Sequence, residues 1–113
     1  METSILARQD CLTLDNGMRL RLLSALEVLQ ARREAEELAQ APRERALCSN
    51  ASLLSRALET AEGSPVFSGG EAVLAGLRVE EIATLAKTWS QFNRKENPAL
   101  TMGQEEAETL KKN

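Results

Sequence analysis

The stretch that decides the fold runs from Val79 to Pro98 and reads VEEIATLAKTWSQFNRKENP. Its apolar residues recur at the i, i+3, i+4, i+7 spacing of one helical face. They are Ile82, Leu85, Ala86, Trp89 and Phe92. Acidic residues in the first turn and basic residues in the last suit the helix dipole, and Pro98, which lacks an N–H, ends the helix. Because Trp89 is the only tryptophan and aromatic rings bury large areas, we expect the other elements to pack on this helix.

The length of 113 residues is that of one domain with a single modest core. Aromatic residues make up only 3%, so the core must be built of leucine, alanine and valine. The formal net charge of −3 disfavours a nucleic-acid-binding protein, which usually carries a basic stripe. Arginines nevertheless make the first half locally basic and keep that class open. They are Arg19, Arg21, Arg32, Arg33, Arg43 and Arg45.

The chain contains no histidine, which removes the commonest general base and the commonest metal ligand. Cys11 and Cys48 match no metal-ligand spacing, and we expect them to be small buried thiols. Gly69-Gly70 lacks the lysine of a phosphate loop, and a flexible helix entry explains it better. The paired carboxylates are interpreted as solvated helix faces; they are Glu34 with Glu37, Glu80 with Glu81, and Glu105 with Glu106. We therefore predict no enzyme, no catalytic residue, no metal site and no cofactor.

A hairpin is predicted at about residues 9–23. Asp15-Asn16-Gly17 is a turn signal, because asparagine and glycine tolerate positive φ. The flanks alternate, with leucines and Met18 on one face and Arg19 and Arg21 on the other. Since a lone hairpin is marginally stable in water, its apolar face must lie on helices or on a partner.

Ser24 and Glu27 form a capping box that opens a helix over about residues 25–40, which Pro42 ends. A second helix is expected from about Arg43 to Glu62, with Gly63 just past its end. The short link between the two predicts an antiparallel helical hairpin.

Val66 and Phe67 are expected to form an apolar plug or a very short strand, followed by a short helix from Glu71 to Ala75 that Gly76 ends. The predicted fold class is mainly α, a small helical domain with an N-terminal β-hairpin. Residues 1–98 form the single domain in this interpretation, and residues 99–113 form a weakly ordered C-terminal tail or a short helix.

Three stretches resemble small tail-assembly proteins encoded by phages and prophages of bacteria. They are Leu26 to Leu38 (LEVLQARREAEEL), Arg45 to Leu58 (RALCSNASLLSRAL) and Trp89 to Pro98 (WSQFNRKENP). The resemblance covers roughly residues 12–98 and leaves Leu100 to Asn113 outside. It implies a mostly helical, non-enzymatic tail assembly chaperone that coats the tape-measure protein while the tail tube polymerises. The implied partners are tape-measure or tail-tube proteins.

No apolar run approaches the ~20 residues of a membrane span, and the first residues are polar and mixed, unlike a signal peptide. We therefore expect no membrane partner and a cytoplasmic location, in the host cell cytoplasm if the gene is phage-encoded. The alternative function is a small DNA-binding or regulatory protein. A helix–turn–helix around Gly76 would present Glu80, Glu81 and Trp89, which is a poor face for reading a DNA groove.

Trp89 admits two interpretations, a core anchor or an exposed anchor for a partner, and the apolar face it shares favours the core. The candidate partner-binding residues are Trp89, Phe92, Arg94, Leu100, Met102 and Leu110. The last three lie in the C-terminal segment, whose composition suits a marginal helix or a tail that folds on a partner.

Overall fold

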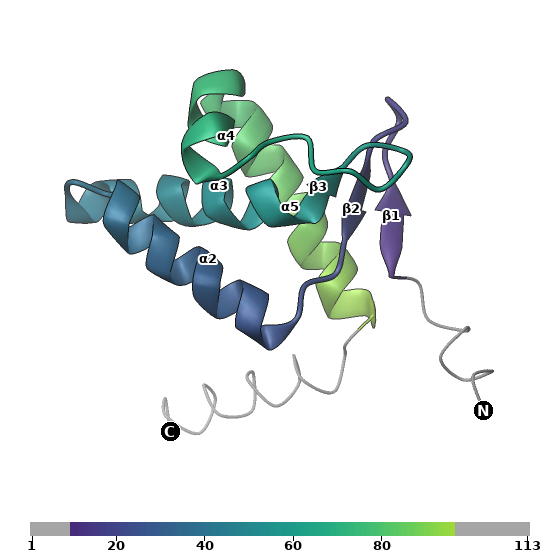
Figure 1. Cartoon of the computed structure of the whole chain (residues 1–113), viewed down its shortest axis with the longest axis horizontal. Helices are drawn as coiled ribbons and strands as arrows, with labels where there is room; N and C mark the ends of the chain where they lie inside the picture. The colour runs from purple at the N-terminus through teal and green to yellow at the C-terminus, as the bar shows by residue number, and fades with distance from the viewer. Residues whose placement is uncertain (1–9, 97–113) are drawn as a thin grey trace.

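The computed structural model describes residues 10–96, which form a mainly α domain with a three-stranded antiparallel sheet (Figure 1). The elements in chain order are β1 (Cys11–Thr13), β2 (Arg19–Arg21), α2 (Ala25–Leu38), the 3-10 helix η1 (Pro42–Glu44), α3 (Arg45–Ala57), β3 (Leu58–Glu59), α4 (Gly70–Gly76) and α5 (Val79–Glu96). The sheet stands at one side of the domain in Figure 1, and α2, α3 and α4 extend away from it. The predicted fold class is confirmed.

Helix α5 follows the amphipathic pattern of its sequence. Ile82, Ala86, Trp89 and Phe92 are buried, and Leu85 is half-buried. The helix is confirmed as far as Glu96, and Pro98 lies outside the described residues.

The N-terminal hairpin is confirmed in position. β1 and β2 pair antiparallel, with Leu12 opposite Leu20. Gly17 closes the turn with φ 91°, and the Met18 N–H donates to Asn16 Oδ1 at 3.0 Å. The leucine on β2 points into the core, since Leu20 is fully buried.

The second helix is shorter than predicted, and the expectation that it reaches Glu62 is wrong. α3 ends at Ala57, and Leu58–Glu59 turns extended to become β3, which pairs with β2. In this arrangement Leu58 is buried opposite Leu20, and Glu59 reaches the two arginines of β2. A continued helix would give up both contacts. Gly63 is accordingly no helix C-terminal residue; it closes the following turn with φ 92°.

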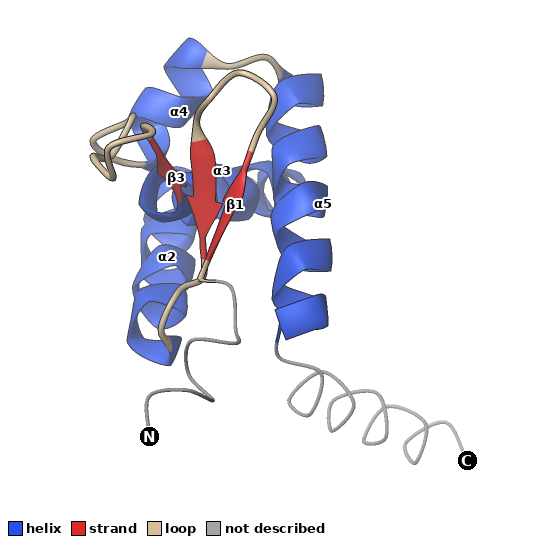
Figure 2. Cartoon of the chain, turned by 90° about the vertical axis from the view of Figure 1, so that its right-hand side faces the viewer, coloured by secondary structure: helices blue, strands red, loops and turns tan. Residues whose placement is uncertain are grey.

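The hairpin therefore belongs to a larger sheet with the order β1-β2-β3 (Figure 2). After the turn that Gly63 closes, the chain runs back along β3. The Val66 N–H donates to Leu58 O at 3.3 Å, and Glu59 forms an isolated antiparallel β-bridge with Pro65. Val66 and Phe67 are half-buried and pack on the core, as the apolar-plug interpretation expected.

Helix α2 begins at the predicted capping box. The Glu27 N–H donates to Ser24 Oγ, and the Ser24 N–H donates to Glu27 Oε1. The helix ends at Leu38, and Pro42 begins η1, because a fixed φ suits the first position of a helix. α2 and α3 pack on one another across this short link.

The core centres on α3, so the expectation that the other elements pack on α5 is wrong. α3 contacts α2, α4, α5 and the sheet. Small residues on its buried faces, such as Ala51, Ser52 and Ala57, let several elements approach one helix. The core cluster draws on β2, α3, β3, α4 and α5; its members are Leu20, Ala51, Leu54, Ala57, Leu58, Val73, Ile82 and Trp89.

Candidate protein-binding groove

A surface groove of about 390 Å³ opens between the hairpin tip, the segment after β3 and the first half of α5. We call it the hairpin groove. Its lining residues are Asn16, Met18, Leu58, Val66, Phe67, Leu77, Glu80, Glu81, Thr84 and Leu85. They come from four separate parts of the chain, which the sheet and the α4–α5 corner bring together.

The lining divides into an apolar floor and a polar rim. The floor consists of Met18, Leu58, Val66, Phe67, Leu77 and Leu85, all buried or half-buried. The rim consists of Asn16, Glu80, Glu81 and Thr84, all exposed. An apolar concavity with a few polar groups at its edge is the usual form of a binding site in proteins.

The two rim glutamates stand in the first turn of α5. Glu81 Oε1 accepts a hydrogen bond from the Arg78 N–H at 2.8 Å, which satisfies a backbone donor at the start of the helix. Their negative charge is also favoured by the helix dipole. The sequence alone indicates a solvated helix face for Glu80 and Glu81; both are exposed, and they also border the groove.

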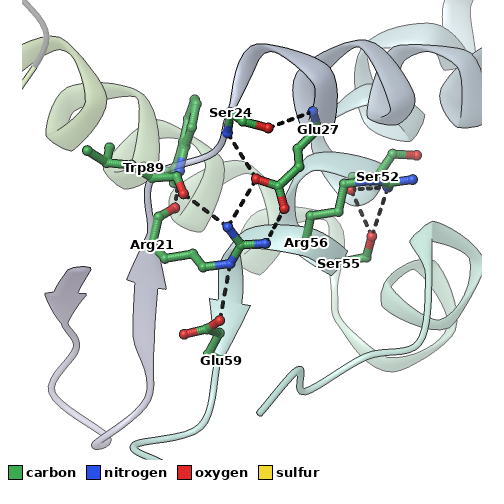
Figure 3. A network of polar contacts seen from close by, with 9 residues as sticks. Arg21, Ser24, Glu27, Ser52, Ser55, Arg56, Glu59 and Trp89 are labelled. Atoms are coloured by element: carbon green, nitrogen blue, oxygen red, sulfur yellow. Dashed lines mark hydrogen bonds and ion pairs between the residues drawn. The ribbon is translucent and has the colours of Figure 1, made fainter. Parts of the chain in front are cut away.

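A second polar cluster, centred on Arg21, lies between β2, β3, α2 and α5 (Figure 3). The Arg21 guanidinium donates to both carboxylate oxygens of Glu27, and its Nε lies 3.1 Å from Glu59 Oε2. Arg19 Nε donates to the other oxygen of Glu59 at 3.0 Å. The Trp89 indole Nε1–H donates to the backbone oxygen of Arg21 at 2.8 Å.

These contacts shift the ionisation of the Arg21 cluster. The hydrogen bond from Arg21 is the main reason that the pKa of Glu27 falls to about 2. The reciprocal hydrogen bond to Glu27 raises the pKa of Arg21. Arg21 thus holds the Glu27 carboxylate in its charged form. The cluster ties four elements together, and the low pKa of Glu27 leaves this carboxylate unsuited to exchange a proton near neutral pH.

A third cluster joins α2, α3 and α4 through Glu34. Its carboxylate accepts from Arg56 Nη1 at 2.7 Å and from the Gly70 N–H at 3.0 Å. Burial raises the pKa of Glu34, but these hydrogen bonds outweigh burial and the pKa is lowered. The interpretation of Glu34 and Glu37 as a solvated pair is thus wrong for Glu34, which is half-buried, whereas Glu37 is exposed.

The candidate partner-binding residues named from sequence do not lie in the hairpin groove. Trp89 and Phe92 are buried, at 8% and 5% exposure. Arg94 is exposed in the last turn of α5. Leu100, Met102 and Leu110 lie outside the described residues.

Sequence reasoning missed the groove because its parts are distant in the chain. The sequence shows two parts of the groove as separate features: an apolar Val66-Phe67 pair, and a Glu80-Glu81 pair at the start of a helix. Their meeting depends on β3, which brings the segment after it beside the hairpin, and β3 was not predicted.

Cys48 is buried and Cys11 half-buried, and both are free thiols. Burial raises the pKa of the Cys48 thiol, which keeps it protonated and unreactive. Among residues 10–96 no group of three or more histidine, cysteine, aspartate or glutamate side chains is placed to hold a metal ion. None of the helices in the same residues is long and apolar enough to cross a membrane.

Comparisons of the chain with protein-family models, curated proteins and solved structures return no match.

Proposed function

We propose that this protein is a non-enzymatic adaptor that binds a segment of a partner protein in the hairpin groove. The observation that carries the proposal is the open apolar floor with its polar rim. Covering one bulky apolar side chain in such a site contributes about 1.5–3 kcal/mol. Even a millimolar complex requires about 4 kcal/mol of net binding free energy, so several such contacts must act together.

We further propose that the partner is a tape-measure or tail-tube protein, bound during virion assembly in the host cytoplasm. The support is the resemblance of three stretches to phage tail assembly chaperones. Two of these stretches build α2 and α3, and the third lies in α5 as far as Glu96. They form the scaffold, while the groove is built mostly by the segments between them. A shared scaffold with a variable binding surface is how one fold serves many partners.

Ion pairs engage three of the six first-half arginines on which the alternative of a small DNA-binding or regulatory protein rests, whereas Arg32, Arg33 and Arg43 are exposed. Arg19 and Arg21 are held by Glu59 and Glu27, so they are not available to neutralise phosphates. Arg45 lies 3.7 Å from Glu36. Titration with duplex DNA at low salt tests this alternative, because binding dominated by phosphates weakens steeply as salt is added.

The proposal is tested by binding between purified proteins. The gene should lie between a tail-tube gene and a very long tape-measure gene, and those two neighbours supply the partners. Isothermal titration calorimetry should then give a saturable complex with one of them and a negative heat-capacity change, the mark of buried apolar surface. A gene in a metabolic operon, or no heat with either purified partner, would contradict the proposal.

A further inference from the structure

We infer that the hairpin groove selects a partner segment in which a bulky apolar side chain is flanked by lysine or arginine. The inference rests on the proposed function and adds the chemistry of the bound segment. It comes from the combination of floor and rim, since the floor is apolar and the charged residues of the lining, Glu80 and Glu81, are both acidic.

The carboxylates are placed so that an occupant meets them. Both Glu80 and Glu81 line the groove and both are exposed, so a side chain that fills the floor carries its neighbours past them. Asp15, exposed in the hairpin turn, precedes the rim residue Asn16. Asp15 does not itself line the groove, so the acidic charge of the lining stands on the helix side.

The nearby basic residues neutralise the negative charge of the rim only in part. Arg19 is committed to Glu59, at 3.0 Å. Arg78 immediately precedes α5 and is exposed, but it does not line the groove. A lysine or arginine beside the anchoring side chain thus gains attraction at the rim, whereas an acidic flank is repelled. Such rim charges contribute to the choice of partner more than to raw affinity.

The same charges argue against other occupants. A second copy of this chain carries a formal net charge of −3 and would bring further negative charge to an acidic rim. An uncharged apolar segment fits the floor but brings no positive charge to the rim carboxylates. A basic apolar segment satisfies both parts of the surface.

The test compares three blocked hexapeptides, each with glycine at both ends and two central leucines, flanked by two lysines, two glutamates or two serines. The full chain is titrated with each peptide and followed by NMR, which detects millimolar binding. We expect the lysine peptide to shift the amides of Leu77, Thr84 and Leu85. Its affinity should exceed that of the glutamate peptide by about tenfold, as two partly exposed ion pairs supply.

A protein variant supplies the matching control. Glu80→Gln with Glu81→Gln removes the rim charge, and the glutamine oxygen can still accept from the Arg78 N–H. This variant should bind the lysine and glutamate peptides equally. Glu36→Gln with Glu37→Gln removes the same charge from exposed positions of α2 and should keep the preference. Sedimentation of the free protein checks that no second copy occupies the groove.

The outcomes separate this inference from the proposed function. Equal affinities for the three peptides, or a preference that survives Glu80→Gln with Glu81→Gln, would overturn the charge selection. Binding of a tape-measure or tail-tube protein would then still support the adaptor. Conversely, selective binding of the lysine peptide with no binding of either tail protein would support the inference and refute the assigned partner.

Discussion

Trp89 fastens the last helix to the sheet in two ways. Its ring belongs to the core cluster, and its indole N–H donates to the backbone oxygen of Arg21 on β2. The hydrogen bond matters because a buried indole N–H without a partner is costly. The residue that identified the helical face from sequence is therefore also the one that links α5 to a strand 68 positions away.

Replacing Trp89 with alanine should lower the free energy of unfolding by roughly 3–5 kcal/mol, because it opens a cavity and removes the bond to Arg21. Trp89→Phe keeps most of the ring volume and should lose less. Urea unfolding followed by circular dichroism measures both, since the alanine variant has no tryptophan fluorescence. If the urea concentration at the unfolding midpoint of Trp89→Ala equalled that of the wild type, the side chain would lie on the surface instead.

Glu27 makes the free energy of unfolding depend on pH. Arg21 holds its pKa at about 2, below its ordinary 4.5. A carboxyl group with a lowered pKa stabilises the folded state above its unfolded pKa and loses that contribution as the pH falls toward the folded value. Glu27→Gln, which keeps a side-chain oxygen for the Ser24 N–H, should cost about 1–2 kcal/mol at pH 7 after solvent screening.

The difference between wild type and Glu27→Gln should shrink between pH 4.5 and pH 2, the range set by the two pKa values. Urea titrations at pH 7, 4 and 2.5 test this dependence. A difference that stays constant across these three pH values would show that the Arg21–Glu27 pair does not act as described.

The helices and the hairpin could be predicted at the scale of elements because their signals are local. The capping box at Ser24 and Glu27, the Asn16-Gly17 turn and the apolar face of α5 each lie within a few residues of sequence. β3 could not be predicted in this way. Residues 45–58 continue a helical pattern, and Leu58 leaves it only because Leu20 and the arginines of β2 offer a better site.

The groove and the Glu34 cluster were missed for the same reason. Glu34 has the spacing of an exposed helical residue, yet Arg56 and the Gly70 N–H lie 22 and 36 positions further along the chain. The Gly69-Gly70 pair was correctly assigned to a helix entry. What sequence did not indicate is that a carboxylate of this chain occupies the start of α4.

Gly70 sets how closely α4 approaches α2 and α3. A Cβ there would lie 2.7 Å from Ser52 Oγ and 2.9 Å from Leu38 Cδ1. Gly70→Ala should therefore destabilise the fold by about 1–3 kcal/mol, the usual cost of overpacking. At Gly69 a Cβ would meet only a carboxylate oxygen of Glu34, at the longer distance of 3.1 Å, so Gly69→Ala should cost less. Thermal unfolding of the two variants compares them, and equal losses would contradict this account of the junction.

At the scale of the whole molecule, the charged clusters and the groove have separate roles. The Arg21 and Glu34 clusters pair their charges inside the domain and hold the elements in place. The groove combines exposed acidic residues with an apolar floor. A second apolar surface exists on α2, where Leu26 and Leu29 are 59% and 45% exposed, and neither residue lines the hairpin groove.

The most direct test of the account is the effect of filling the groove on binding of the tape-measure or tail-tube protein. Thr84→Trp places a large ring at an exposed lining position, and Ala83→Trp places the same ring at an exposed position of α5 outside the lining. Calorimetric titration should show at least a tenfold loss of affinity (about 1.4 kcal/mol) for Thr84→Trp and wild-type affinity for Ala83→Trp, with both variants folded. Full affinity in Thr84→Trp, together with lost binding when Leu26 and Leu29 are changed to serine, would move the binding surface to α2 and contradict the account.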